Sequence, residues 1–402
     1  MSDTIMKSAP TNQASEVASG KAMDLTDQLQ NRLGNYEGLK WTDCQLNLVK
    51  EIHRRFCEIY LFSLSPESKQ PDLVVKVPIG HSDLAYQEQL LDHTFVDRPR
   101  LFGRVEPDSK PWKEYAALRR IQSHFDALGD SRFGVVRVYD LLPQQQAMVM
   151  QWIDQSSLRQ RLYATHRLSA ARKASRLETA FSNTGAWLRQ HHQLPALEHC
   201  ESRSTSRDDY LAAVEQFIAY LSNHVDDPDE LRRMHQQIIR LANEHLPSSI
   251  PCGQVHGDFA PRNVFIDNAN RVSVFDTLGR FNAPIYEDIA KMLMTVKASG
   301  PQMLSRGMLY DRKRLQRYED AFLEGYFDDQ TIPLTSIRLF LAQLILEHWA
   351  AVVFQHEQQR GFKRVVKGVR RSLWKAGFLT YLREILVAPV GTRMARTSED
   401  VQ

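Results

Sequence analysis

Residues 255–276 read VHGDFAPRNVFIDNANRVSVFD and bring together three oxygen-bearing side chains, Asp258, Asn263 and Asp276. A short apolar run follows Asn263, a turn-forming DNAN comes next, and an alternating VSVF ends at Asp276. This pattern predicts a β-hairpin. Because antiparallel pairing sets the residue before the first strand beside the residue after the second, we expect Asn263 and Asp276 to lie close together.

An amide oxygen beside a carboxylate suits Mg²⁺, which keeps several waters and takes few protein ligands along with substrate phosphates. Asn263 and Asp276 are therefore candidate Mg²⁺ ligands. Asp258 lies five residues before Asn263, where a carboxylate can orient an incoming hydroxyl and accept its proton. The stretch predicts phosphoryl transfer with Asp258 as the general base and Mg²⁺ as a cofactor.

The spacing His256-x-Asp258-x-x-x-x-Asn263 matches the H-R-D-x-x-x-x-N catalytic loop of protein kinases, with Gly257 in place of the arginine. HGDFAPRN followed by Asp276 resembles the aminoglycoside phosphotransferase and choline kinase family, small-molecule kinases that share the protein-kinase fold. The resemblance implies an α+β fold with two lobes: a small antiparallel sheet with one helix, and a larger, mostly helical lobe.

A lysine and a glutamate for the phosphate site are found upstream. Lys76 lies in the β-branched run LVVKV, which predicts a strand, and Glu114 falls on the inward face of a helical pattern, one turn before Leu118. Because a buried carboxylate is costly when unpaired, we expect an ion pair between Lys76 and Glu114. This is the lysine and glutamate pair of the kinase fold, in which the lysine holds the α- and β-phosphates. The alternative is a surface lysine and an ordinary exposed glutamate.

Two further strands are expected at residues 135–142 and 147–153, joined by a polar turn. The segment MVMQWI within the second strand resembles the hinge of this family, in which backbone groups pair with adenine. We therefore place adenine against Gln151 and Ile153, through their main-chain N–H and C=O groups. ATP is then the expected phosphate donor, and a plain core strand is the alternative.

One segment departs from the family pattern. Strands are expected near residues 46–50 and 56–64, but the turn EIHRR between them contains no glycine, so its backbone cannot approach phosphates closely. Phosphate contacts there would come from the side chains of His53, Arg54 and Arg55. A solvated basic turn explains the same residues. The missing glycines favour an alternative: a catalytically weak or inactive kinase-like protein that binds nucleotide and has a regulatory role.

The chain has 402 residues, of which 43% are hydrophobic, so it can bury the cores of two lobes. We predict a disordered tail at 1–23, a nucleotide-binding lobe at 24–153, a lobe with the catalytic loop and acceptor site at 154–387, and a flexible tail at 388–402. Amphipathic patterns predict helices near residues 170–193, 207–224, 228–245, 312–327, 333–358 and 360–386.

The expected location is cytoplasmic. Four cysteines without paired or metal-type spacing fit reduced thiols, and the first 23 residues lack the apolar core of a signal peptide. The longest apolar stretch, residues 339–354, contains polar residues and is short for a bilayer, so we expect a packed helix.

Residues 360–375 contain seven Lys or Arg residues and no acidic residue, with apolar side chains on the other face of the expected helix. Such a face fits peripheral contact with an anionic membrane, or an acidic or phosphorylated acceptor, and a solvated face is the alternative. A polycationic acceptor would be repelled if this helix borders the acceptor site. We expect the acceptor to be a hydroxyl of a small molecule or glycoconjugate, and we expect no nucleic acid partner.

Other function classes fit less well. A protein kinase would be expected to carry arginine at Gly257 and a longer segment after Asp276, which only 11 residues separate from Asp288. Asp288 itself matches the aspartate that opens a helix in the small-molecule kinases, where we expect a structural role. A nucleic-acid binder would rest on residues 360–375 alone, against a net charge of only +3.

Overall fold

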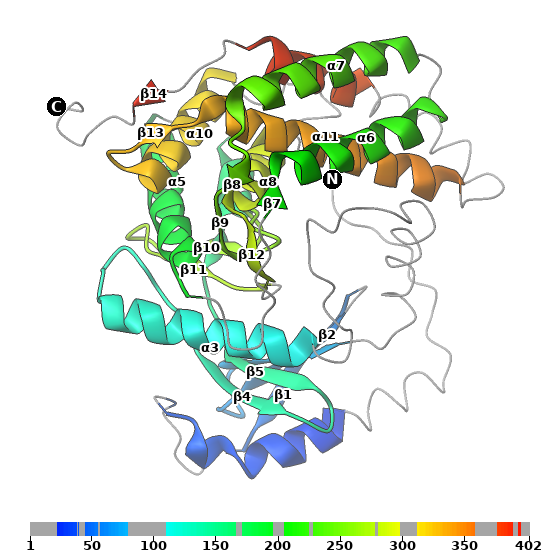
Figure 1. The fold of residues 1–402 in the computed structure, drawn as a ribbon. Coiled ribbons are helices and arrows are strands. Elements are labelled where there is room, and N and C mark those ends of the chain that lie inside the picture. Colours follow the sequence, from blue (N-terminus) through cyan, green and yellow to red (C-terminus); the bar gives the residue numbers. More distant parts are fainter. Residues whose placement is uncertain are drawn as a thin grey trace. The chain divides into compact units, whose positions relative to one another are not determined.

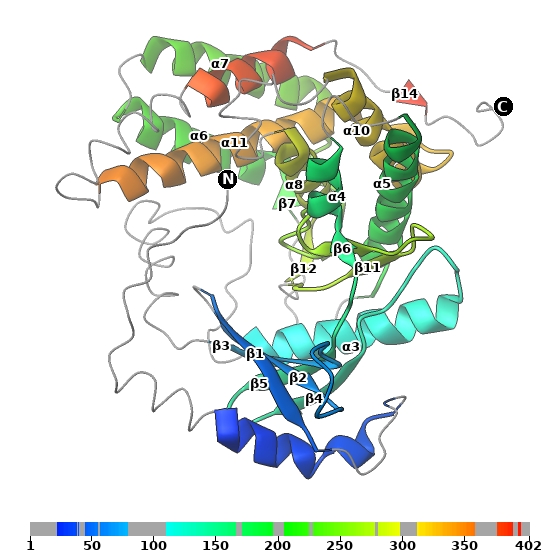
Figure 2. The same cartoon turned by 180° about the vertical axis from the view of Figure 1, so that it is seen from behind.

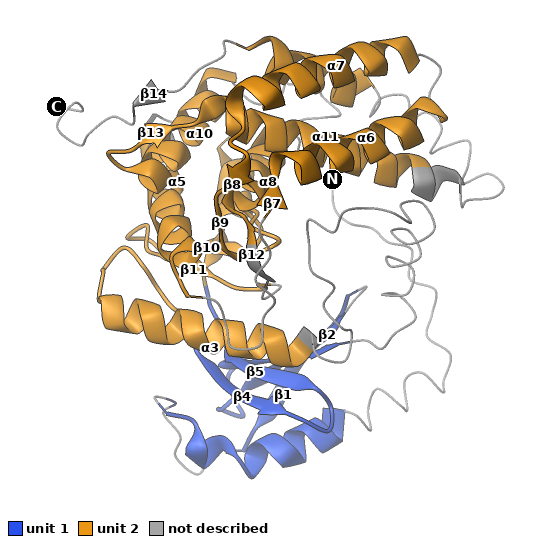
Figure 3. Ribbon diagram, in the orientation of Figure 1, with its two compact units in different colours: residues 1–83, 137–154 blue, residues 84–136, 155–402 orange. Residues whose placement is uncertain are grey.

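The computed structural model describes residues 22–37, 39, 45–54, 57–78, 110–165, 171–195, 205–224, 228–277, 280–297, 312–357, 376–388 and 393–394. The chain divides into two compact units, coloured separately in Figure 3. Unit 1 comprises residues 1–83 and 137–154, and unit 2 comprises residues 84–136 and 155–402.

Unit 1 is built on a five-stranded antiparallel sheet with the strand order β1-β2-β3-β5-β4. The strands are β1 (Asn47–His53), β2 (Cys57–Ser63), β3 (Leu73–Pro78), β4 (Val138–Leu142) and β5 (Ala147–Gln151). The last two confirm the pair of strands expected on either side of the polar turn.

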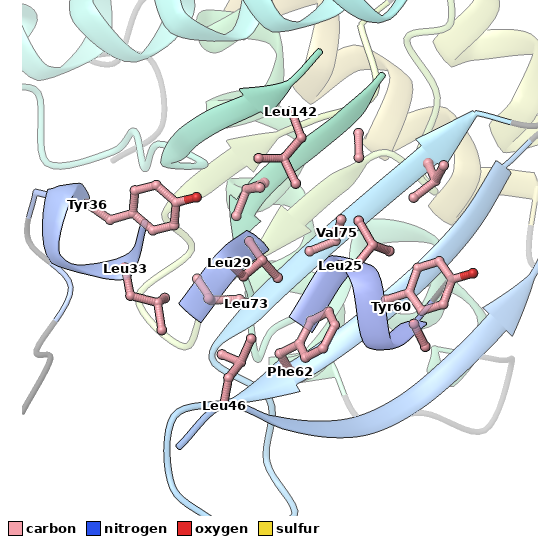
Figure 4. Packing of buried hydrophobic residues seen from close by; sticks show 14 of the residues in the cluster. Leu25, Leu29, Leu33, Tyr36, Leu46, Tyr60, Phe62, Leu73, Val75 and Leu142 are labelled. Carbon is pink, nitrogen blue, oxygen red and sulfur yellow. The ribbon is translucent and has the colours of Figure 1, made fainter. Parts of the chain in front are cut away.

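A helical segment at residues 22–30, followed by the 3₁₀ helix η1 (Leu33–Asn35), covers one face of this sheet (Figure 4). Leu25, Leu29 and Leu33 recur at helical spacing and are fully buried in a cluster with strand residues such as Phe62 and Val75. An ion pair of 2.8 Å between the Arg32 guanidinium and the Asp140 carboxylate holds the end of this segment to β4.

Alternation along β3 decides which way Lys76 points. Leu73, Val75 and Val77 belong to the buried cluster under the N-terminal helix. Because neighbouring residues of a strand face opposite sides of the sheet, Lys76 projects from the other side. Its register partners are Ile59 on β2 and Met148 on β5. A lysine on a face with apolar neighbours is the arrangement expected of a nucleotide-binding sheet.

The hairpin between β1 and β2 differs from the expectation. The predicted turn EIHRR is wrong in its position, because the ladder continues through Ile52 and His53, which pair with Ile59 and Glu58. Beyond His53, the Arg54 N–H donates to the Cys57 carbonyl at 2.9 Å. Period-two alternation around the β-branched Ile52 extends the strand beyond the predicted end.

His53 therefore lies on the ladder and not in a loop. Its ring nitrogens lie 3.7 Å from carboxylate oxygens of both Glu51 and Glu58. Two carboxylates repel phosphate, so this environment disfavours the phosphate contact that the sequence suggested for His53. Arg55 lies outside the described residues.

Unit 2 is largely helical (Figures 1 and 2). Its helices are α3 (Lys110–Leu128), α4 (Leu158–Ala164), α5 (Ala171–His192), α6 (Arg207–Ser222), α7 (Pro228–His245), α8 (Ile285–Lys297), α10 (Arg312–Phe327) and α11 (Leu334–Glu357). Five of the six helices expected after residue 153 are confirmed to within a few residues. Of the sixth, residues 376–387 are helical, and the basic segment 360–375 lies outside the described residues.

Short strands complete unit 2. They are β6 (Ser156–Ser157), β7 (Thr205–Ser206), β8 (Ser249–Ile250), β9 (Cys252–Val255), β10 (Val264–Ile266), β11 (Val272–Val274), β12 (Arg280–Pro284), β13 (Thr331–Ile332) and β14 (Arg393–Met394). β11, β10 and β6 form one small sheet, and β12 pairs with β9.

Helix α3 packs within unit 2. The Phe125 ring stacks on Trp187 of α5 at a centroid distance of 5.0 Å, and Phe133, just after α3, bridges to Val272 on β11. The sequence had placed this helix in the nucleotide-binding lobe, and the predicted lobe boundaries stay a prediction.

Helix α11 contains the segment Leu334–Val353, which is long and apolar enough to cross a membrane by length and composition. However, 72% of its most apolar window is buried inside the protein. It packs against α8, α6 and α7, which is the behaviour of a core helix.

Two glycines let α5 and α10 approach closely. A Cβ atom at Gly185 would lie 2.0 Å from the Phe322 carbonyl oxygen, and one at Gly325 would lie 2.0 Å from the Ser182 carbonyl oxygen. Both obstacles are backbone atoms, so neither can move aside cheaply. Close packing of these helices brings together their C-terminal ends, where His192 of α5 and Tyr326 of α10 lie.

We predict that Gly185→Ala destabilises the protein by at least about 2 kcal/mol, because the added methyl group forces the two helices apart. Thermal and urea unfolding measure the change. Gly34→Ala is the control, since a Cβ atom at Gly34 meets nothing within 4 Å. Equal stability of the two variants would show that the helix crossing tolerates side chains.

Candidate active site

The catalytic-loop motif follows strand β9 and leads into the β10–β11 hairpin. Val264 pairs with Val274, and the Phe275 N–H donates to the Asn263 carbonyl at 3.2 Å. This confirms the predicted hairpin and places Asn263 beside the residue that precedes Asp276. Asp276 has a backbone φ of 63°, a left-handed conformation that is uncommon outside glycine and is often found at functional sites.

The side chain of Asn263 is fixed by Asp258. Its amide nitrogen donates to the Asp258 carbonyl at 2.9 Å and to carboxylate oxygen Oδ2 at 3.0 Å. The amide oxygen of Asn263 is therefore the atom left to bind a metal. Among the described residues, no group of three or more His, Cys, Asp or Glu side chains is arranged to hold a metal ion, so the candidate Mg²⁺ site rests on Asn263 and Asp276.

The Asp258 carboxylate has two cationic neighbours that sequence reasoning missed. One guanidinium nitrogen of Arg262, Nη2, donates to both carboxylate oxygens, at 2.6 Å from Oδ1 and more closely at Oδ2. The Lys291 ammonium, on α8, lies 3.8 Å from Oδ1. The proposed base is thus held by charge as well as by the Asn263 amide.

His256 joins the catalytic loop to the end of β11. The Asp258 N–H donates to its Nδ1 at 3.3 Å, so Nδ1 carries a lone pair and Nε2 carries the proton. That Nε2–H donates to the Phe275 carbonyl at 3.0 Å. The imidazole therefore fixes the residue before Asp276 relative to the backbone of Asp258.

Asp288 holds the backbone of the catalytic loop from the first turn of α8. One of its oxygens accepts the His256 N–H at 2.6 Å, and the other accepts the Gly257 N–H at 2.9 Å. Gly257 has a φ of 83°, in the left-handed region, which explains why glycine replaces the arginine of protein kinases at this position. The structural role expected for Asp288 has a direct physical basis in these two bonds.

Buried histidines surround Asp288. His192 Nε2 donates to the Asp288 carboxylate at 3.2 Å, and its Nδ1 lies 2.8 Å from the Tyr326 hydroxyl. Burial raises the pKa of Tyr326, so this hydroxyl stays protonated and donates to Nδ1. His191 stacks on Trp187, and burial holds its pKa well below the ordinary value. Both histidines pack inside the protein, and His192 also belongs to the hydrogen-bond network of the loop.

These contacts set the charge state of Asp288. Burial alone raises the pKa of its carboxyl, but the hydrogen bond from His192, together with the other neighbouring histidines, lowers it below the ordinary value. A lowered pKa means that the ionised carboxylate stabilises the fold at pH values above its unfolded pKa, and that this stability is lost as pH falls through the folded pKa.

We predict that Asp288→Asn destabilises the protein by about 2 kcal/mol or more at pH 7. Asparagine has only one acceptor oxygen, so its NH₂ group would face the backbone N–H of either His256 or Gly257. The difference from the wild type should narrow below about pH 4, as the native carboxylate is protonated. Unfolding curves between pH 3 and pH 8 measure this. Asp229→Asn, at an exposed carboxylate on α7, should stay within about 0.5 kcal/mol at every pH. A constant Asp288→Asn effect across pH would contradict the ionised clamp.

The predicted nucleotide contacts lie in unit 1. Lys76 is central in β3, and Gln151 ends the adjacent β5. The Gln151 N–H already donates to the Arg137 carbonyl and the Trp152 N–H to the Asp72 carbonyl, each at 2.8 Å.

Ile153 follows the end of β5 by two residues, and its contact with adenine stays a prediction. Glu114, on α3 of unit 2, is only 5% exposed, which confirms its inward position. Its pairing with Lys76 joins residues of two units and stays a prediction.

Comparison with solved structures identifies similar folds. A putative aminoglycoside phosphotransferase from Ralstonia eutropha is 11% identical, with 90% of this chain and 98% of that chain covered and a TM-score of 0.55. A thermostable mutant of aminoglycoside phosphotransferase APH(4)-Ia, in a ternary complex with AMP-PNP and hygromycin B, is 11% identical, with 91% and 100% covered and a TM-score of 0.50. At such identities the likeness shows the fold alone: an α+β, protein-kinase-like fold.

No curated protein sequence matches the chain. A family model described as the phosphotransferase enzyme family, APH, matches residues 77–354, which include the catalytic loop, the β10–β11 hairpin and Asp288. This match spans more than half of the chain, and it agrees with the resemblance carried by HGDFAPRN and Asp276. The chain belongs to the phosphotransferase enzyme family.

Proposed function

We propose that this protein is a Mg²⁺-dependent kinase that transfers the γ-phosphate of ATP to a hydroxyl of a small molecule or glycoconjugate. The observation that carries the proposal is the catalytic loop itself, where Asp258 and Asn263 are hydrogen-bonded and the hairpin places Asn263 beside the residue before Asp276. A purely nucleotide-binding protein would have no need for a carboxylate held in this way.

Asp258 is the general base of the proposed reaction. Its carboxylate accepts the proton of the acceptor hydroxyl as the oxygen attacks the terminal phosphate. Asp258 is 21% exposed at its side chain, so a substrate can reach it. The Asn263 amide fixes its orientation, which reduces the entropic cost of lining up the hydroxyl.

Asn263 and Asp276 are the proposed Mg²⁺ ligands, through an amide oxygen and a carboxylate. These two residues would hold the ion, which would supply positive charge to offset the negative charge of the phosphates during transfer. The residues fit this ion because Mg²⁺ is commonly held by only one or two protein oxygens together with phosphates and water. His256 keeps the backbone around both ligands in place by its bonds to Asp258 and Phe275.

Unit 1 supplies the proposed nucleotide contacts. Lys76 binds the α- and β-phosphates, and the backbone of Gln151 and Ile153 pairs with adenine. Glu114 is proposed to position Lys76. Support comes from the side of the sheet on which Lys76 lies, opposite the face covered by the N-terminal helix.

The acceptor is proposed not to be polycationic. The support is the pair of cations beside the base: Arg262 contacts Asp258, and Lys291 lies 3.8 Å from it. An amine-rich acceptor would meet like charge at the reacting oxygen. Peripheral membrane contact through residues 360–375 stays a prediction, because these residues lie outside the described part of the chain. The cytoplasmic location also stays a prediction.

A catalytically weak nucleotide-binding protein is the second candidate function. The observation that favours it is the short β1–β2 reversal, which has no glycine and places His53 against two carboxylates. Incubation of the purified protein with γ-labelled ATP and a metabolite extract, followed by mass spectrometry, separates the two functions. A labelled, Mg²⁺-dependent product supports the kinase function. Nucleotide binding without any phosphate transfer supports the catalytically weak nucleotide-binding protein.

We predict that Asp258→Asn still binds nucleotide but transfers phosphate at a rate lowered about 10²-fold or more, since general bases contribute roughly 10² to 10⁴. Single-turnover transfer from labelled ATP measures the rate, and binding of ADP serves as the folding control. Transfer at the wild-type rate would remove Asp258 from the role of base.

We predict that Asp276→Ala weakens binding of Mg²⁺-ATP and changes binding of metal-free ATP much less, because the carboxylate acts through the ion. Calorimetric titration with Mg²⁺ and with EDTA makes the comparison. Asp267→Ala, in the exposed turn of the same hairpin, is the matched control and should change neither affinity. Equal losses with and without Mg²⁺ would make Asp276 a structural residue.

A further inference from the structure

Arg262 is hydrogen-bonded to the carboxylate of Asp258, the proposed general base. Its guanidinium contacts both oxygens of Asp258. Asn263 donates to Oδ2 at 3.0 Å, and the Lys291 ammonium lies 3.8 Å from Oδ1. A hydroxyl that is to give its proton to Asp258 needs an open lone pair on the carboxylate. Arg262 and Asn263 engage three of the roughly four lone pairs of the carboxylate, and the Lys291 charge lies near Oδ1, the oxygen that keeps the fourth, so departure of one of these neighbours opens the carboxylate further.

Arg262 is the donor that can leave most easily. Its side chain is 40% exposed, whereas that of Lys291 is 21% exposed. Asn263 is also tied to the Asp258 carbonyl at 2.9 Å, so its amide cannot turn away without losing two bonds. Water can solvate the guanidinium of an exposed arginine in intermediate positions, which keeps the cost of its movement low.

A phosphate can draw Arg262 away from Asp258. A guanidinium binds phosphate with the same two-pronged geometry that it uses for a carboxylate, and a terminal phosphate carries more negative charge. Arg262 immediately precedes Asn263, the proposed ligand of the ion that accompanies the phosphates. The arginine is thus attached to the backbone at the place where the terminal phosphate of a donor is expected.

We propose that Arg262 senses the phosphate donor: it pairs with Asp258 when no nucleotide is bound and moves to the γ-phosphate of bound ATP, which frees Asp258 for the acceptor hydroxyl. The inference rests on the proposed function. Donor binding then makes the base more open to the acceptor, and Arg262 gains a second role, as a cation on the transferring phosphate. The movement exchanges ion pairs and breaks no covalent bond.

The first test is the affinity for Mg²⁺-ADP and Mg²⁺-AMP-PNP, measured by calorimetry. AMP-PNP carries the terminal phosphate and ADP lacks it. Arg262→Gln should weaken AMP-PNP binding about tenfold, the size expected for one charged hydrogen-bonded contact, and leave ADP binding unchanged. Arg232→Gln is the control, because it removes an exposed arginine that pairs with Asp229 on α7, and it should change neither affinity.

The second test uses the competition between Asp258 and phosphate for Arg262. Asp258→Asn removes the carboxylate that holds the arginine, so AMP-PNP should bind several-fold tighter to this variant than to the wild type. The gain should shrink when Arg262→Gln is also present. A simple release of repulsion between Asp258 and phosphate would give the same gain in both backgrounds, so equal gains overturn the proposal.

The outcomes separate this inference from the proposed function. Equal losses of ADP and AMP-PNP binding in Arg262→Gln, or no loss of either, overturn the donor-sensing role while the kinase function stands. A folded wild-type protein that binds neither nucleotide overturns the proposed function itself. If Arg262→Gln does not fold, Arg262→Lys replaces it, and a loss smaller than tenfold and confined to AMP-PNP is expected because a lysine keeps the charge without the two-pronged geometry.

Discussion

The Asp288 carboxylate is the contact on which the catalytic loop depends. It accepts the backbone N–H groups of His256 and Gly257, the two residues directly before Asp258, and the buried His256 N–H would otherwise lack this partner. Because the carboxylate projects from the first turn of α8, the position of that helix sets the path of the loop. The close crossing of α5 and α10 at Gly185 supports the same contact, since these helices carry His192 and Tyr326 to the far side of Asp288.

Most elements of the fold could be predicted because their side chains repeat at the period of a helix or a strand. Five of the helices after residue 153 begin and end within a few residues of the predicted bounds. The end of β1 could not be predicted. The segment EIHRR resembles a turn in the sequence, but its first three residues continue the strand once Ile52 pairs with β2. The helix at residues 22–30 shows Leu25 and Leu29 at helical spacing, but only the exposed apolar face of a finished sheet gives that helix a reason to form.

The candidate site, like the fold, could be predicted only in part. The position of Asn263 beside Phe275 could be predicted because hairpin geometry is fixed by residues that are close in sequence, while the roles of Asp258, Asn263 and Asp276 stay predictions. Lys291 and His192 could not, since their roles come from helices packed against the loop from far along the chain. Arg262 had a local signal, its position four residues after Asp258, but a surface ion pair is the ordinary meaning of that spacing.

His256 links the backbone of Asp258 to the end of the β10–β11 hairpin. A neutral imidazole can accept a bond at one nitrogen and donate at the other, and His256 uses both, accepting the Asp258 N–H and donating to the Phe275 carbonyl. The ring is also fully buried and lies edge-on to Phe259, so packing holds it in place. The left-handed backbone at Asp276 can then be held against its strain by the same ring that sets the direction of Asp258.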